Sequence, residues 1–182
     1  MKLNSKIFLG AVLATSVAGA ASANPIIDVY MGGMFGAGGN SVYYDGHHKN
    51  YSAQSYGALF GIDIPLLRVE AEYNHIMNDD FSTNDAMLNA YFKMLSTMIH
   101  PYFGVGVGSV FGGHTDINNV RYDIKSTVAY QGMLGLTFDI LAVPLKFDVE
   151  GRALYAPNVM EVANKKPDLL QYDARLKLRY VF

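Results

Sequence analysis

From about residue 27 to the C-terminus, apolar and polar residues alternate with a period of two in one segment after another. This period is typical of β-strands, because successive side chains point to opposite faces of a sheet. We count eight such segments of about ten residues each and find no helical periodicity. Their approximate ranges are 27–35, 57–64, 67–73, 86–94, 101–111, 128–138, 145–155 and 170–182. The pattern predicts an all-β protein with eight antiparallel strands.

In the most regular segments, one face is apolar and the other is charged. Over 145–155 the odd-numbered positions are mostly apolar, and every even-numbered position as far as Arg152 is charged. The charged faces carry both signs in near balance, so buried charges could pair across a narrow interior. We expect a charge network inside a barrel from Arg68, Glu70, Glu72, Lys93, Lys146, Asp148, Glu150, Arg152, Asp173, Arg175, Lys177 and Arg179, together with Asp28, Asp63 and Asp85.

Alternation alone also fits a soluble β-sandwich or a lipocalin-like barrel. Aromatic residues near both ends of the apolar faces predict two girdles, which a bilayer with two interfaces favours. Short connections near 65–66, 95–98 and 139–142 alternate with longer ones over 36–56, 76–85, 112–127 and 156–168. These features favour an eight-stranded antiparallel up-and-down transmembrane β-barrel with four long extracellular loops and short periplasmic turns.

The interior of such a barrel is only wide enough for side chains to fill it. Gly104, Gly106 and Gly108 share the predicted lumen face and would leave room for long charged side chains from neighbouring strands. The sequence therefore predicts a plugged cylinder and not a wide pore.

The first 23 residues read as a cleaved signal peptide. Lys2 and Lys6 precede an apolar run, and small residues end at Ala23, so cleavage is expected between Ala23 and Asn24. A membrane anchor is the alternative, but the run is shorter than about 18 residues. The barrel domain would then comprise residues 24–182. Cysteine is absent, which excludes a disulfide-stapled scaffold and a lipid-modified cysteine.

Candidate chemistry is sparse. His47 and His48 beside Asp45 could ligate a metal, but no further ligand is evident. Ser52 and Ser55 fall in the same predicted loop, yet nothing brings a nucleophile, base and acid together. We expect no cofactor, no metal and no catalysis. The formal net charge of −2 gives no indication of nucleic-acid binding.

Several stretches in order resemble the small outer-membrane barrels of the OmpX and opacity-protein type, within the porin-like surface antigens. They are residues 67–73, 88–92, 100–108, 129–132 and 176–182. Tyr180 and Phe182 in the last stretch resemble the signal that the barrel assembly machinery reads. The resemblance implies adhesion, host-cell contact or envelope maintenance, and it implies no catalytic residues.

The preferred hypothesis is a monomer in the bacterial outer membrane whose loops, at the cell surface, contact a host receptor or matrix. Its other expected partners are outer-membrane lipid and the barrel assembly machinery. The loop residues available for contact are Tyr43, Tyr44, Tyr51, Tyr56, Asn118, Asn119, Lys165 and Lys166. The alternatives are a structural envelope protein, a small porin-like channel and a lipid-modifying enzyme.

Overall fold

The described residues form nine antiparallel strands. The computed structural model describes residues 27–44, 47–78, 81–94, 99–117, 120–123, 126–140, 143–159 and 168–182. The strands are β1 (Asp28–Tyr44), β2 (His47–Asp63), β3 (Leu67–Asn78), β4 (Phe81–Lys93), β5 (Ile99–Ile117), β6 (Val120–Asp123), β7 (Thr127–Ile140), β8 (Leu145–Ala156) and β9 (Asp168–Val181). No helix among these residues is long and apolar enough to cross a membrane.

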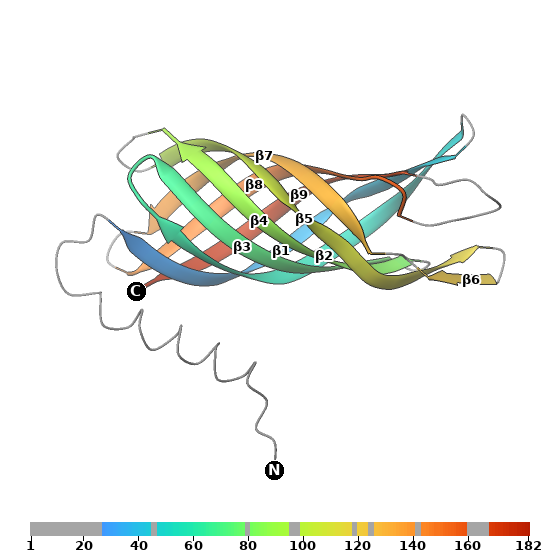
Figure 1. The fold of residues 1–182 in the computed structure, drawn as a ribbon. Helices are drawn as coiled ribbons and strands as arrows, with labels where there is room; N and C mark the ends of the chain where they lie inside the picture. Colours follow the sequence, from blue (N-terminus) through green and yellow to red (C-terminus); the bar gives the residue numbers. More distant parts are fainter. Residues whose placement is uncertain are drawn as a thin grey trace, which may run out of the picture.

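Eight of these strands close into a barrel, as the alternation predicted. Neighbours follow the order β4-β3-β2-β1-β9-β8-β7-β5, and a further pairing of β4 with β5 closes the ring (Figure 1). The short strand β6 pairs with β5 and extends it as a hairpin at the end away from the C-terminus. The first and last strands pair directly, so both begin or end at the same end of the barrel.

The prediction of four long loops is wrong for the first two and in part for the third. β1 and β2 stay paired as far as Tyr44 and His47, and β3 and β4 stay paired as far as Asn78 and Phe81. In the third predicted loop, β5 continues and pairs with β6. Backbone pairing can continue beyond the apolar part of a barrel, where both faces can be polar and the alternation is no longer required. The stretch between β8 and β9 keeps its predicted length, and the three short connections lie where they were predicted.

The outer face of the barrel is apolar. On β8, Val149 is 40% exposed, whereas its neighbours Asp148 and Glu150 are buried inside the barrel. Large exposed apolar side chains occur on every strand of the wall, including Met31, Phe60, Val69, Leu88, Val105, Leu134, Val149 and Leu178. An apolar surface this continuous is costly in water and typical of a lipid-facing barrel.

Aromatic rings gather near both ends of this outer face. Near one end Tyr130 pairs with Tyr155, while near the other the rings of Phe92 and Phe103 lie 5.5 Å apart between centroids. The rings of Phe138 and Phe147, 6.4 Å apart, add to the second group. These are the two girdles that the sequence predicted.

Candidate functional site

The interior is where the charged side chains of the strands converge. Twelve of the fifteen residues of the predicted network are buried there: Asp63, Arg68, Glu70, Glu72, Asp85, Asp148, Glu150, Arg152, Asp173, Arg175, Lys177 and Arg179. The other three, Asp28, Lys93 and Lys146, are partly exposed at the mouth near the chain ends. Lys93 pairs with Asp63, and Lys146 lies 3.5 Å from Asp28.

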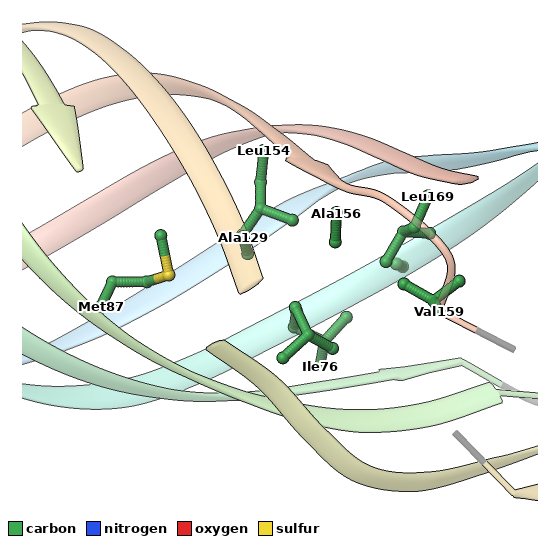
Figure 2. Close-up of a cluster of buried hydrophobic side chains, with 9 residues drawn as sticks. Ile76, Met87, Ala129, Leu154, Ala156, Val159 and Leu169 are labelled. Atoms are coloured by element: carbon green, nitrogen blue, oxygen red, sulfur yellow. The ribbon is translucent and has the colours of Figure 1, made fainter. Parts of the chain in front are cut away.

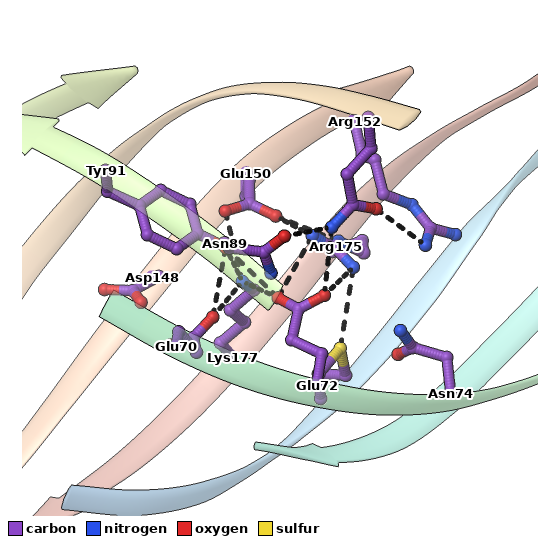
Figure 3. Close-up of polar contacts among 12 residues, drawn as sticks. Glu70, Glu72, Asn74, Asn89, Tyr91, Asp148, Glu150, Arg152, Arg175 and Lys177 are labelled. Atoms are coloured by element: carbon purple, nitrogen blue, oxygen red, sulfur yellow. Dashed lines mark hydrogen bonds and ion pairs between the residues drawn. The ribbon is translucent and has the colours of Figure 1, made fainter. Parts of the chain in front are cut away.

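Lys177 of β9 is at the centre of the network (Figure 3). Its Nζ atom lies 2.8 Å from Glu70, 2.5 Å from Glu72 and 3.2 Å from Glu150. Arg175, two residues earlier on the same face, pairs with Glu72 at 3.1 Å and also with Glu150. These contacts join β3, β8 and β9 across the lumen.

Arginine pairs continue the network on both sides of this centre. Towards the chain ends, Asp148 accepts hydrogen bonds from Arg68 at 3.1 Å and from Arg179 at 2.8 Å. Towards the hairpins, Arg152 donates to Asp173 at 2.6 Å and to Asp85 at 3.3 Å. Because each buried charge has an oppositely charged partner, the cost of taking it out of water is offset by pairing.

Three buried tyrosines complete the network, and the sequence reasoning missed them. The hydroxyl of Tyr30 donates to Glu70 at 2.6 Å, and that of Tyr102 donates to Glu150 at 3.0 Å. The guanidinium of Arg68 lies 4.0 Å from the ring centroid of Tyr91 and 4.6 Å from that of Tyr102. The alternation of the strands could have revealed them, because residues two positions apart lie on the same face. Tyr30 is two positions from Asp28, and Tyr91 is two positions from Lys93.

Two of the lumen glycines, Gly104 and Gly135, make room for these aromatic rings. A Cβ atom added to Gly135 would lie 2.5 Å from Cζ of Tyr102, and one added to Gly104 would overlap Tyr91. The glycines therefore leave room for side chains from neighbouring strands, but tyrosine rings take the space at Gly104 and Gly135, and a Cβ atom added to Gly106 would meet Asn89 and Gln131.

An apolar cluster fills the lumen on the hairpin side of the charges (Figure 2). Its members are Ala53, Ile76, Met87, Val110, Ala129, Leu154, Ala156, Val159 and Leu169. The sequence reasoning assigned Ile76 to a loop and missed that Leu154 follows Arg152 on the inward face. The interior therefore has a charged layer and an apolar layer, and the side chains of both are buried.

Other predicted candidates lie elsewhere or outside the described part. Ser55 is buried inside the barrel and is not in a loop, whereas Tyr56 faces outward, 5.3 Å from His75 between ring centroids. Tyr180 and Phe182 lie on the outer face with centroids 5.3 Å apart. Residues 1–26, with Ala23 and Asn24, lie outside the described residues, as do residues Asp45, Asn118, Asn119, Lys165 and Lys166. The side chains of Tyr43, Tyr44, His47, His48 and Tyr51 lie outside them as well.

No group of three or more His, Asp or Glu side chains within the described ranges is placed to hold a metal ion. What the interior can do chemically is pair its own charges.

A closed eight-stranded barrel with an apolar exterior and a charged, filled interior defines a small outer-membrane β-barrel protein. Within that class, the chain belongs to the surface antigen family, whose model matches residues 23–145. The family and the fold confirm the resemblance stated from the sequence.

Solved structures share this fold at low sequence identity. Neisserial surface protein A matches with a TM-score of 0.61 and 14% identity over 84% of this chain and 96% of that one. The N-terminal barrel domain of Pseudomonas aeruginosa OprF matches with a TM-score of 0.56 and 12% identity over 83% of this chain and 97% of that one. The attachment invasion locus protein Ail of Yersinia pestis, solved with a heparin analogue, matches with a TM-score of 0.51 and 11% identity over 84% of this chain and 99% of that one. No curated protein sequence matches the chain significantly.

Proposed function

We propose that this protein is a monomeric, non-catalytic display barrel that presents its hairpins and connections at the bacterial surface to contact other molecules. The observation that carries the proposal is the filled interior. Paired charges and the apolar cluster occupy the lumen, and the exterior wall is apolar and suited to lipid. Contacts with soluble or cellular partners then fall to the connections between strands.

The hairpin end is the end that we propose to face outward. The β1–β2 and β5–β6 hairpins extend there, opposite the C-terminus (Figure 1). Outer-membrane barrels have their short turns in the periplasm and their longer connections outside the cell. In this orientation Tyr180 and Phe182 lie at the periplasmic end, where the barrel assembly machinery could read them during insertion.

Adhesion to a host receptor or matrix is the role that the family description and one structural neighbour favour. The family is described as surface antigen, and the neighbour Ail is an attachment protein solved with a sulfated heparin analogue. A sulfated glycan is therefore the first soluble probe for this chain. Its own connections include the basic pair Lys165 and Lys166.

The test exchanges the connections one at a time for Gly-Ser segments: residues 45–46, 79–80, 118–119 and 160–167. Binding of expressing cells to host cells and to immobilised heparin is measured, with resistance of the envelope to detergent as the control. We expect at least one exchange to abolish binding while detergent resistance is unchanged. Unchanged binding in all four, with loss of detergent resistance, would instead support a structural envelope role.

The channel and enzyme alternatives are tested with the purified protein. In planar bilayers we expect no stepwise ion conductance, because charged and apolar layers both fill the lumen. Labelled lipid A should be recovered unmodified after incubation. Regular conductance steps, or a modified lipid, would replace the display proposal.

A further inference from the structure

In the connections near the chain ends, the residues that the structure describes are apolar; we call them the turn ring, and they are Ile64, Pro65, Leu66, Met94, Val143 and Pro144. Leu66 is 47% exposed, Met94 56% and Val143 45%. Turns in water usually carry Gly, Pro, Asn, Asp or Ser, and the four ring residues other than the prolines are of none of these types. The connections at the other end of the barrel follow that rule in sequence, with Asp45-Gly46, Asp79-Asp80 and Asn118-Asn119. The two ends of the barrel therefore differ in chemistry.

The backbone of the turn ring satisfies much of its own hydrogen bonding. The amide of Ile64 donates to the carbonyl of Leu67, and that of Lys93 donates to Leu66, both at 2.9 Å. The amide of Leu145 donates to Val143 at 2.8 Å. The two prolines carry no amide hydrogen at all. Satisfied amides are what an apolar environment requires of a turn.

The turn ring is continuous with the lipid-facing wall. Leu67, Ile99 and Ile140 at the adjoining strand ends are exposed and apolar. The aromatic girdle at this end consists largely of phenylalanine, whereas the girdle at the hairpin end is rich in tyrosine, as in Tyr130 and Tyr155. A tyrosine hydroxyl favours the hydrated interface, and phenylalanine has no such group.

The height of the wall places the turn ring just beyond the hydrocarbon. From Leu145 to Tyr155 the strand rises about 25 Å, at ~3.3 Å per residue and a tilt of about 40°. This equals the apolar band of about 25 Å that such barrels present to lipid. Val143 lies two residues further on, at the depth of the lipid headgroups.

We propose that the turn ring is embedded in the interfacial layer of the phospholipid leaflet and anchors this end of the barrel in it. The occupant is lipid because the ring continues a surface that already faces lipid. Interfacial segments bury an apolar face about 5–10 Å into the headgroup and acyl boundary. The charged mouth beside the ring, with Lys93 and Lys146, would then face the polar headgroups. This proposal depends on the barrel spanning the membrane and not on what the hairpins bind.

The test uses single cysteines, because the sequence has no native cysteine. Leu66→Cys and Val143→Cys report on the ring, Val149→Cys on the middle of the wall, and the exposed Ser126→Cys on the hairpin end. Each is labelled with a polarity-sensitive fluorophore. The full chain is folded into phosphatidylethanolamine and phosphatidylglycerol vesicles that carry a nitroxide at the headgroup or deep in the acyl chain. Folding of each variant is checked by its heat-dependent gel mobility.

We expect blue-shifted emission at 66 and 143, with the strongest quenching by the headgroup nitroxide. Position 149 should be quenched most by the deep nitroxide, and position 126 should be the least quenched by either. Water-like emission without quenching at 66 and 143 would overturn the proposal. A second outcome would also overturn it: water-like emission in vesicles, together with shielding of positions 66 and 143 from water in native outer membranes. That result would mean that a protein partner covers the ring.

Discussion

At the scale of single residues, one ammonium group holds three carboxylates at the centre of the barrel. Lys177 is fully buried and contacts Glu70, Glu72 and Glu150. A buried ion pair adds little to stability compared with an apolar core, but removal of one member leaves an uncompensated charge. The network therefore penalises any change that removes a single partner, and it stabilises one set of cross-lumen contacts.

Lys177→Met should lower the free energy of unfolding by about 3–5 kcal/mol, because three carboxylates lose their shared cation. Urea unfolding in lipid vesicles measures this loss. The matched control is Lys146→Met at the mouth, where the lysine side chain is 22% exposed and the loss should be about 1 kcal/mol or less. Equal losses in the two variants would contradict the central role of Lys177.

Two glycines of β7 give a second comparison between single residues. Gly135→Ala places a methyl group against the ring of Tyr102 and should destabilise the barrel by about 1–3 kcal/mol. Gly132→Ala points outward with nothing within 4 Å and should be neutral or slightly stabilising, because glycine weakens a strand interior. The same unfolding measurement tests both. A loss at Gly132 as large as at Gly135 would mean that the packing against Tyr102 is not what matters.

At the scale of the strand, successive residues meet different surroundings. On β8, Val149 lies on the outer wall between Asp148 and Glu150, both of which face the lumen. The register of β8 is therefore constrained on both faces, by lipid outside and by the charge network inside. A one-residue slip would expose charges to lipid and bury apolar groups among charges.

Labelling of cysteines on β8 tests this assignment. A cysteine in place of Val149 should react with a lipid-soluble maleimide, whereas one in place of Asp148 or Glu150 should be protected. Val149→Arg should in addition destabilise the barrel by about 2–4 kcal/mol, as a charge near the middle of the membrane does. Labelling at 148 and 150 but not at 149 would mean that the faces are reversed.

The last strand ends in the residues that we expect the barrel assembly machinery to read. Phe182 is exposed on the outer face, while its backbone amide donates to the carbonyl of Val29 at 2.9 Å. Phe182→Asp keeps that backbone bond, removes the aromatic ring and adds a charge at the membrane interface, where a charge costs less than at the midplane. It should therefore reduce the yield of inserted barrel more than the stability of barrels already formed. Phe182→Leu is the control, and heat-dependent gel mobility of outer-membrane fractions gives the yield. Equal yields for wild type and Phe182→Asp would contradict a role of Phe182 in assembly.

At the scale of the whole molecule, the barrel must reach its membrane as an exported chain. We predict that the mature protein begins at Asn24 and fractionates with the outer membrane, because an A-x-A site precedes the strands. Mass spectrometry of the purified N-terminus, together with membrane fractionation, measures both. An intact Met1 would rule out cleavage, and a folded soluble pool would contradict the membrane assignment.

The sequence by itself determined the eight strands of the barrel and which of their two faces carries the charged residues. This was possible because alternation with a period of two is local and can be read within ten residues. It did not determine the strand ends on the hairpin side, since alternation stops where both faces can be polar while backbone pairing continues.

Only the tertiary structure decided which buried groups meet. Lys177 reaches Glu70 across 107 positions of the chain, and the tilt and stagger of the closed barrel bring the two strands into opposition. The same closure places Tyr30, Tyr91 and Tyr102 among the charges. It also brings Ile76, Leu154 and Leu169 together on the hairpin side of the charges. Contacts across a lumen depend on closure and stagger, and no local pattern in the sequence records either one.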